Sequence, residues 1–572
     1  MAKIGALRER IGASGDLQLP VGRPAPYTAR PMTTPPPDTT DELSDGRIAE
    51  LLTQFQPQNV PPGRRIFANR NLRMSSIKMI GYDMDYTLAE YHVTVEELAV
   101  RLTVEKLINE YGYPAEVAEL PYDPNFAIRG LIVDKRTGNL LKMDSHKHIS
   151  RVFHGTKTLE KQERRRLYRN ESIRISGARY ALIDTLFAVP EAWLYAVLVD
   201  TLDERASKAP AKRRRKRKDG SISTAVGRRY QKLYDDIRAA IDMVHADQSL
   251  KNIIIADMAR YVRKDPDLAG SLHDLRHAGK QLFLMTNSYG PYSTKVMEYL
   301  LDGERPDYPS WKDYFDIIVV GAKKPSFFEK GCEFQQLDAD HRHMGHPVTS
   351  FKHRETYEGG NLADFERMAG VAGDEILYIG DNLYGDILRS KKTSTWRTVM
   401  IVPELERELK LSRDQAPSFE RRSQLETHRR QIDLELHQEQ QLLSSLSEFV
   451  KDRQGQFSAD ERKAFEHAMS VSTDKKGDLE SALHKCLGAI WHLNRRIERS
   501  FNPYWGMLFK SRAEHSIFGE QIEDYACVYT SRASNFAAYS PFQYFRTPRD
   551  FLPHEHAVVE QSKAHNLLEQ DR

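Results

Sequence analysis

The sequence predicts an α/β fold built on a parallel sheet. Helical stretches at residues 269–279 and 362–369 separate apolar runs, as the crossovers of a parallel sheet require. At 572 residues the chain is too long for one compact core, so we expect two or more domains. Four mostly apolar runs of strand length each end at a polar group, and they cover residues 77–82, 280–285, 315–320 and 376–379.

The first run ends at two acidic residues, Asp83 and Asp85. Open parallel sheets bind ligands at the carboxyl ends of their strands, so both side chains are expected at that edge. One carboxylate can attack a phosphorus atom, and the other can protonate the leaving oxygen. Alone the pair is weak evidence, because such a short motif is more often a solvated turn.

The second and third runs end at groups suited to a phosphate. Thr286-Asn287-Ser288 follows the second run and offers hydroxyl and backbone N–H groups to a phosphate oxygen. Lys323-Lys324-Pro325 follows the third run, where an ammonium group can neutralise charge on a phosphoryl group in transfer. Taken singly, the first would be read as a helix cap and the second as a loop.

The fourth run ends at Gly380-Asp381, with Gly385-Asp386 close behind. Two carboxylates at a strand end can hold a hard divalent cation, which prefers oxygen ligands. The glycines let the backbone turn sharply beside them. Gly-Asp pairs are common in ordinary turns, but four reactive groups in this order after four apolar runs are not expected by chance.

The motifs together resemble the haloacid dehalogenase superfamily of phosphohydrolases, and more closely its cytosolic purine 5′-nucleotidases. The resemblance covers residues 60 to 560 and implies a Rossmannoid parallel sheet core with a large inserted cap domain. It also implies a phosphoric monoester hydrolase of the 5′-nucleotidase type. The stretches that carry it are Asp83–Leu88, Leu377–Lys392, Trp396–Thr398, Val402–Leu405, Tyr544–Arg546 and Phe551–Glu555.

The resemblance assigns the chemistry to the acidic residues. Asp83 is the nucleophile that forms an aspartyl-phosphate, and Asp85 is first the general acid and then the general base. Mg²⁺ is the implied cofactor, held by the Asp83 carboxylate, the backbone carbonyl of Asp85, Asp381 and water molecules. Asp386 orients the lysine of the site or a metal-bound water.

The resemblance also assigns the groups that hold the phosphate. Thr286 and Lys324 contact its equatorial oxygens, and Lys324 is preferred to Lys323 because the family has its lysine immediately before the proline. The substrate-binding residues nearest the phosphate are Lys251, Asn287 and Ser288.

The resemblance implies that the protein recognises the purine base of its substrate. Phe187 matches the stacking aromatic residue of the family, and Arg238, Asp242 and His245 address the base. A surface ion pair would also explain the four-residue spacing of Arg238 and Asp242. Ala188 stands where the family has an asparagine that touches the base, which affects the rank order of purines. IMP or GMP is the first choice of substrate, with phosphate transfer to a nucleoside as a second outcome.

The chain is expected to fall into five segments. The cap would exclude water and read the part of the substrate that does not react. Residues 415–500 have helical periodicity and many charges, which predicts a long helical pair packed on the core or on another subunit. The segments are 1–45, a disordered Pro-rich extension; 46–90, first part of the core; 91–270, cap with a basic insertion near 205–225; 271–410, second part of the core; and 411–572, helical extension and C-terminal segment.

Composition excludes several classes of protein. The chain has 40% hydrophobic and 29% charged residues and a formal net charge of +3, too small to indicate a nucleic-acid partner by itself. No apolar run approaches the length of a membrane span, and Met1–Gly15 lacks the apolar segment of a signal peptide. Three cysteines do not make a disulfide framework, so a cytoplasmic location and no membrane partner are expected.

Other features leave alternatives open. Lys212–Lys218 is a basic run that could bind nucleic acid or direct nuclear import, although a surface insertion is favoured. His341, His343 and His346 could suggest a metal, but a solvated flap is favoured. The chain could also be a phosphatase for another phosphomonoester, or an interaction protein that uses the basic run. The family's tetramers and the long helices favour a homo-oligomer.

Overall fold

The computed structural model describes residues 60–175, 177–208, 224–388, 390, 394–453 and 456–548. They belong to one compact unit that begins at Val60. The predicted extension at residues 1–45, the basic run Lys212–Lys218 and the stretch Phe551–Glu555 lie outside the described residues. Of the helices in the described ranges, none combines the length and the apolar character needed to cross a membrane.

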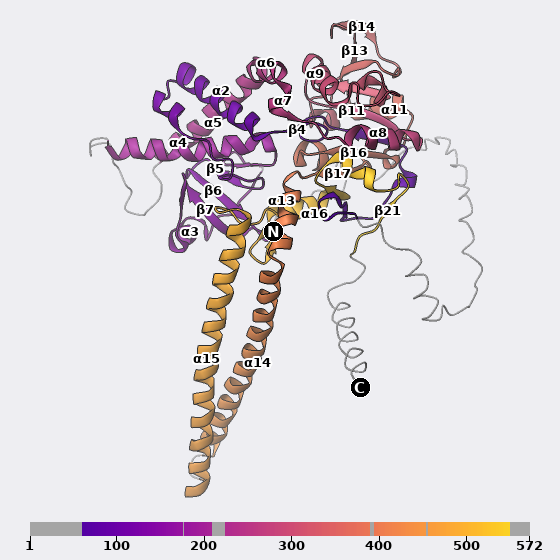
Figure 1. Ribbon diagram of the computed structural model, residues 1–572. Helices are drawn as coiled ribbons and strands as arrows, with labels where there is room; N and C mark the ends of the chain where they lie inside the picture. Colours follow the sequence, from indigo (N-terminus) through magenta and orange to yellow (C-terminus); the bar gives the residue numbers. More distant parts are fainter. Residues whose placement is uncertain are drawn as a thin grey trace, which may run out of the picture. The chain divides into compact units, whose positions relative to one another are not determined.

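The core is a ten-stranded sheet in the order β1-β20-β17-β16-β3-β11-β12-β15-β13-β14 (Figure 1). The strands from β20 to β15 run parallel, and β1, β13 and β14 are antiparallel additions at the edges. The four predicted runs form adjacent strands, which confirms the predicted α/β class. They are β16 (Ile376–Gly380), β3 (Met79–Tyr82), β11 (Gln281–Met285) and β12 (Ile317–Val320).

The register of these strands brings their carboxyl ends to one edge. Tyr82, the last residue of β3, is paired with Leu284 of β11 on one side and Ile379 of β16 on the other. The residues that follow each strand therefore start at the same level of the sheet. The remaining strands of the sheet are β1 (Phe67–Ala68), β13 (Phe334–Leu337), β14 (His343–Pro347), β15 (Thr356–Gly359), β17 (Arg397–Ile401) and β20 (Val528–Thr530).

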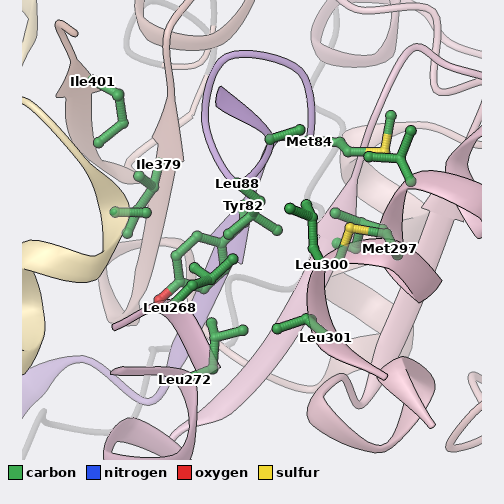
Figure 2. Close-up of a cluster of buried hydrophobic side chains, with 14 of the residues drawn as sticks. Tyr82, Met84, Leu88, Leu268, Leu272, Met297, Leu300, Leu301, Ile379 and Ile401 are labelled. Carbon is green, nitrogen blue, oxygen red and sulfur yellow. The ribbon is translucent and has the colours of Figure 1, made fainter. Parts of the chain in front are cut away.

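Apolar side chains on both faces hold the sheet in place. Side chains on the two faces of the sheet belong to two separate apolar clusters. Tyr82 and Leu284 belong to the first cluster, and Met79 and Phe283 belong to the second. This explains why the strands read as continuous apolar runs rather than alternating ones. Figure 2 shows the first cluster, where Tyr82 lies among side chains of α8 (Leu268–His277) and α9 (Gly290–Leu301). The second contains Phe365 of α11 (Leu362–Ala369).

A long segment is inserted into the core, and a short pair of strands joins its two ends. β4 (Glu90–Tyr91) pairs with β10 (Val262–Arg263) in an antiparallel arrangement. Between them lies a five-stranded antiparallel sheet in the order β8-β7-β6-β5-β9. Its strands are β5 (Ile132–Asp134), β6 (Asn139–Met143), β7 (Ile149–His154), β8 (Lys157–Thr158) and β9 (Tyr180–Leu182).

Helices of the same inserted segment share an apolar cluster of their own. Leu107, Leu194, Leu233 and Ile237 are all buried in it. The cluster is distinct from both clusters of the core sheet, as expected for an insertion with its own core, although the boundaries at residues 90 and 270 stay a prediction. The helices that contribute to it are α2 (Val93–Tyr111), α4 (Val189–Lys208) and α5 (Thr224–Ala246). The segment also contains α3 (Lys161–Tyr168), α6 (Ser249–Ala256) and α7 (Met258–Tyr261).

Two long helices follow α13 (Glu404–Asp414) and confirm the predicted helical region near the C-terminus. α14 (Ala416–Asp452) and α15 (Ala459–Phe501) pack on each other through Ile432 and Ile490 (Figure 1). Ser458 begins α15 with a reciprocal cap, because its hydroxyl accepts from the Glu461 backbone while the Glu461 side chain accepts from Ser458. The chain then forms β18 (Lys510–Ser511), β19 (Glu514–His515), α16 (Ile517–Tyr525) and β20.

The histidine-containing excursion forms a strand pair. β14, which begins at His343, pairs with β13 and is exposed along its whole length. The following strand, β15, joins the parallel sheet beside β12, which the sequence did not predict. Among the described residues, His341 and His346 belong to no cluster of potential metal ligands.

Candidate active site

Asp83 occupies the carboxyl end of the central strand β3. Its backbone N–H donates to the carbonyl of Ile379 in the neighbouring strand, at 2.8 Å. Its side chain is buried and accepts a hydrogen bond of 2.8 Å from the backbone N–H of Met84 at Oδ1. Burial raises the pKa of Asp83 to about 8, although Lys324 opposes the shift. The carboxyl group is therefore fixed in place and pays a large desolvation cost when charged.

Two further buried carboxyl groups, those of Asp381 and Asp386, converge beside Asp83. One oxygen from each of Asp83, Asp381 and Asp386 lies within 4.8 Å of the others. Burial, Asp83 and Asp386 raise the pKa of Asp381 well above its usual range. The Oδ2 atom of Asp381 is buried and has no hydrogen-bond partner among the described residues. A cluster of this kind fits a hard divalent cation, which would satisfy the free oxygen and offset the repulsion.

A glycine makes room for this cluster. A Cβ atom at Gly380, the last residue of β16, would lie only 2.5 Å from Oδ2 of Asp386. The backbone of β16 can therefore approach the Asp386 carboxylate only without a side chain at this position. From the sequence, Gly380 was expected to allow a sharp turn. The structure shows a second requirement for glycine at this position, which is space for the Asp386 carboxylate.

Lys324 pairs with two of the carboxylates. Its ammonium group lies 3.0 Å from Oδ1 of Asp83 and 2.7 Å from Oδ1 of Asp386. It also donates to the hydroxyl of Tyr378 at 2.7 Å and to the carbonyl of Met285 at 3.0 Å. Although burial would lower the pKa of Lys324, Asp386 and Asp83 raise it well above its usual range. The group therefore carries a fixed positive charge beside Asp83.

The neighbouring residues explain why Lys324, and not Lys323, lies beside Asp83. Lys323 is exposed, whereas Lys324 is buried. The side-chain amide of Asn287 accepts from the Lys324 backbone N–H at 2.6 Å and donates to its carbonyl at 2.9 Å. The Asn287 amide thus holds the lysine loop against the end of β11. Thr286, fully buried, accepts the N–H of Ser288 at 3.0 Å through its hydroxyl.

Two hydroxyl groups hold Asp85, and a third hydroxyl group contacts one of them. Tyr91 donates to Oδ1 at 2.5 Å, and Ser288 donates to Oδ2 at 2.8 Å. The Tyr91 hydroxyl is itself 2.9 Å from that of Tyr292. Tyr91 belongs to β4, where the chain leaves the core, so the orientation of Asp85 depends on the ladder at the base of the inserted segment.

A pocket of about 370 Å³ opens in front of these groups. Asp83, Asp85 and Asp381 line it from the core. Thr286, Lys324 and Asp386 are buried next to these groups and are not among the residues that line the pocket. The predicted substrate-binding residues all line the same pocket, and they are Phe187, Arg238, Asp242, His245, Lys251, Asn287 and Ser288.

An aromatic cluster forms the far wall of the pocket. The ring of Phe187 contacts Tyr86 edge-on at 4.8 Å between centroids and His245 at 5.7 Å. Burial, Lys251 and Arg238 lower the pKa of His245, so the ring is neutral at pH 7. This wall suits a flat, uncharged ring with hydrogen-bonding edges.

Charged residues of the inserted segment face the pocket beside that wall. Arg238 donates to Glu191 and to Asp242, both at 2.9 Å. Glu191 is buried, so Arg238 is fixed from behind while Asp242 remains open to the pocket. The ammonium group of Lys251 lies 5.2 Å from the centre of the Tyr292 ring. Burial lowers the pKa of Lys251, and Asp85 opposes this.

Sequence reasoning missed several residues that support the site. Tyr91 and Tyr292 belong to no motif, and Tyr378 lies within Leu377–Lys392 but had no role assigned to it; the contacts of the three residues place them at the site. Glu191 had a signal, since it stands alone within an apolar helical stretch. Arg129 is a buried arginine that donates to Glu404 at 2.8 Å and to the backbone carbonyl of Asp381 at 3.0 Å.

This arrangement can transfer a phosphoryl group. It combines a buried carboxyl group at the end of β3 with a second carboxyl group that also lines the pocket. It adds a fixed ammonium charge and a set of oxygen ligands for a cation. These groups are the parts of a phosphoryl-transfer centre that acts by positioning and charge stabilisation.

Comparison with known proteins agrees with this geometry. The model of the 5′-nucleotidase family matches residues 66–557. A 5′-nucleotidase domain-containing protein of Dictyostelium discoideum is 29% identical over 497 residues, which are 86% of this chain and 74% of that protein.

Solved structures show weaker similarity. One is a predicted phosphoglycolate phosphatase from Haemophilus somnus, with 12% identity and a TM-score of 0.23. The other is CbbY from Rhodobacter sphaeroides in complex with phosphate, with 14% identity and a TM-score of 0.21. Each match covers 57% of this chain and 86% of the other. The assignment of the fold therefore rests on the strand order of the core sheet and not on these two matches.

Proposed function

Because the chain belongs to the 5′-nucleotidase family, a family of phosphoric monoester hydrolases, we propose that it releases phosphate from purine nucleoside 5′-monophosphates, with IMP or GMP preferred. One observation supports this proposal most directly. A single pocket is lined both by Asp83 and Asp85 and by the ring of Phe187 with its polar neighbours. A phosphate at the first set would extend its nucleoside toward the second.

The proposed reaction begins at Asp83. Its carboxylate oxygen bonds to phosphorus as the ester bond to the ribose 5′-oxygen breaks, and Asp85 gives its proton to that oxygen. Asp85 then takes a proton from a water molecule that attacks the aspartyl-phosphate and frees Asp83. Lys324 and Thr286 stabilise the phosphoryl oxygens. A nucleoside hydroxyl in place of the water would give phosphate transfer.

The cofactor that we propose is Mg²⁺. The carboxylates of Asp83 and Asp381 and the backbone carbonyl of Asp85 would hold it, with Asp386 orienting Lys324 or a bound water. When bound, the ion supplies positive charge that lets a carboxylate approach a phosphate dianion. The unpartnered Oδ2 atom of Asp381 supports this assignment.

Metal binding can be measured without turnover. We expect saturating Mg²⁺ to raise the midpoint of thermal unfolding of the metal-free protein by about 2–3 °C, because binding stabilises the folded state. Asp381→Asn should remove this shift. Asp478→Asn, at an exposed position of α15, is the matched control and should retain it. An unchanged shift in Asp381→Asn would contradict the assignment.

Base recognition predicts a selective effect at Phe187. Phe187→Ala should raise KM for IMP about 10- to 50-fold, because stacking and apolar burial are lost. KM for ribose 5-phosphate, which has no base, should change little. Phe542→Ala, at an exposed phenylalanine, controls for general effects. Equal losses on both substrates in Phe187→Ala would show that the residue only maintains the pocket.

The deciding experiment is a substrate panel. Phosphate release from IMP, GMP, AMP and a sugar phosphate would be measured with Mg²⁺ and with EDTA. We expect metal-dependent release that is fastest with IMP or GMP. Faster release from the sugar phosphate would favour a phosphatase for another phosphomonoester. No release from any substrate would favour the interaction protein that uses Lys212–Lys218.

We also propose a cytoplasmic homo-oligomer. None of the three cysteines forms a disulfide, which is common in a reducing compartment. The two long helices expose large apolar side chains such as Leu434, Leu442 and Leu487, which a second copy could cover. Light scattering of the full chain at several concentrations would test the oligomer.

A further inference from the structure

Arg129 is a buried arginine of the inserted segment whose side chain enters the core. It stands shortly before β5 in the sequence. Its guanidinium group contacts three parts of the chain that are far apart in the sequence. They are Glu404 at the start of α13, Asp381 directly after β16, and Phe518 of α16. The inserted segment, the core sheet and two later helices therefore meet at this side chain.

Glu404 holds the guanidinium group with two hydrogen bonds. Nε of Arg129 donates to Oε1 at 2.8 Å, and Nη2 donates to Oε2 at 2.5 Å. Such a bidentate pair fixes the plane of the guanidinium group. The Phe518 ring lies against the same group, with its centre 4.8 Å from Cζ of Arg129. The third donor of the guanidinium group therefore points in a fixed direction.

The backbone beside Arg129 is fixed as well. Gly130 has a φ of +82°, and a Cβ atom at this position would lie 2.6 Å from Cβ of Phe518. Only glycine therefore lets the chain pass so close to α16. The N–H of Gly130 donates to the carbonyl of Ile183, next to β9, at 2.6 Å. Arg129 thus extends from backbone that is hydrogen-bonded to the sheet of the inserted segment.

The third contact of Arg129 reaches the proposed metal ligand Asp381. Nη1 donates to the backbone carbonyl of Asp381 at 3.0 Å. The pairing of β16 with its neighbours ends at Gly380, so this carbonyl lies beyond the paired part of the strand. Oδ2 of Asp381 has no hydrogen-bond partner within the described ranges. The direction of the carboxylate therefore depends on the backbone that Arg129 holds.

We propose that Arg129 is a positioning residue for the metal site. It holds the backbone of Asp381 so that the carboxylate faces Asp83 and Asp386 before a cation arrives. Loss of a residue that orients a metal ligand typically weakens metal binding about 10- to 100-fold. The inference rests on the Mg²⁺ site proposed above, but not on the identity of the substrate. It makes the inserted segment a part of metal binding as well as of substrate recognition.

A role through charge alone would have the opposite effect. Arg129 and Glu404 form an ion pair near the acidic cluster, and the two charges cancel. Removal of the arginine leaves an extra negative charge, which attracts a cation more strongly. Loss of a positioning contact weakens cation binding instead. The sign of the change in Mg²⁺ affinity therefore separates the two roles.

Calorimetric titration of the metal-free full chain with Mg²⁺ tests the inference without turnover. Arg129→Met should weaken Mg²⁺ binding at least about tenfold. The second variant combines Arg129→Met with Glu404→Leu. It removes both charges of the pair, so it should fold even if the single variant does not, and it should show the same loss.

Two controls change the same junction but keep the contact with Asp381. Glu404→Gln retains the guanidinium group that donates to the Asp381 carbonyl. Arg407→Met removes a different contact between α13 and the inserted segment, that of Arg407 with Asn125. Both controls should bind Mg²⁺ within about twofold of the wild type, since the typical effect of losing an orienting contact is much larger.

Unchanged or tighter Mg²⁺ binding in the two Arg129 variants would overturn the inference. An equal loss in Arg407→Met would also overturn it, because any loosening of the inserted segment would then suffice. No Mg²⁺ binding by the wild type would overturn both this inference and the cofactor proposed above. The expected pattern of Mg²⁺ binding in a protein that releases no phosphate from nucleotides would support the inference and contradict only the proposed substrate.

Discussion

Replacing Asp83 with asparagine will reduce phosphate release from IMP by at least about 10⁴-fold, because the attacking oxygen becomes part of a neutral amide. The fold should remain intact. Asparagine has the same shape, and its carbonyl oxygen can still accept the hydrogen bond from the Met84 backbone. The variant also removes one of three buried carboxyl groups that repel one another. Phosphate release and circular dichroism measure the two effects.

Asp85→Asn is the informative comparison for that variant. It should slow release from IMP strongly, because the ribose oxygen is a poor leaving group without a proton. It should slow release from 4-nitrophenyl phosphate much less, since nitrophenolate leaves without one. Asp83→Asn should abolish both reactions. Full activity in Asp83→Asn, or equal losses on both substrates in Asp85→Asn, would contradict the roles proposed for the two residues.

The sequence predicts the core sheet well where burial leaves a clear pattern. β3, β11, β12 and β16 are buried on both faces, and each reads as an apolar run followed by a polar group. β15 is different. It consists of Thr356, Tyr357, Glu358 and Gly359, which have no apolar pattern, and it joins the sheet through its pairing with β12. A strand that forms through pairing with distant segments, and that has no apolar pattern of its own, cannot be predicted from the local sequence.

The residues of the candidate site also fall into two groups, those that the sequence predicts and those that it does not. Asp83, Lys324 and Asp381 each follow a predicted strand, so the topology of a parallel sheet brings them together. Tyr91 and Arg129 belong to the inserted segment and reach the site through its contacts with the core. Nothing in their own sequence neighbourhood indicates this. Residues that follow a predicted strand could therefore be placed at one edge of the sheet from the sequence, whereas the residues that support them required the structure.

Replacing Lys324 with methionine will destabilise the protein and abolish its activity. The ammonium group is buried between Asp83 and Asp386, and its removal leaves both carboxylates without their counter-charge. Loss of one partner of a buried ion pair typically costs about 3–5 kcal/mol. We expect a decrease of that size in the free energy of unfolding of the metal-free protein. Urea unfolding measures it, and phosphate release measures the loss of activity.

A second substitution separates the two effects. Asp386→Leu, added to Lys324→Met, removes a buried charge that the first change left unpaired, so the double variant should recover much of the lost stability. It should remain inactive, because no lysine ammonium group stabilises the phosphoryl oxygens. Lys323→Met, at the exposed neighbour, should change neither property. If the double variant regained activity together with stability, Lys324 would be a structural residue, and stabilisation of the phosphoryl group would have to come from elsewhere.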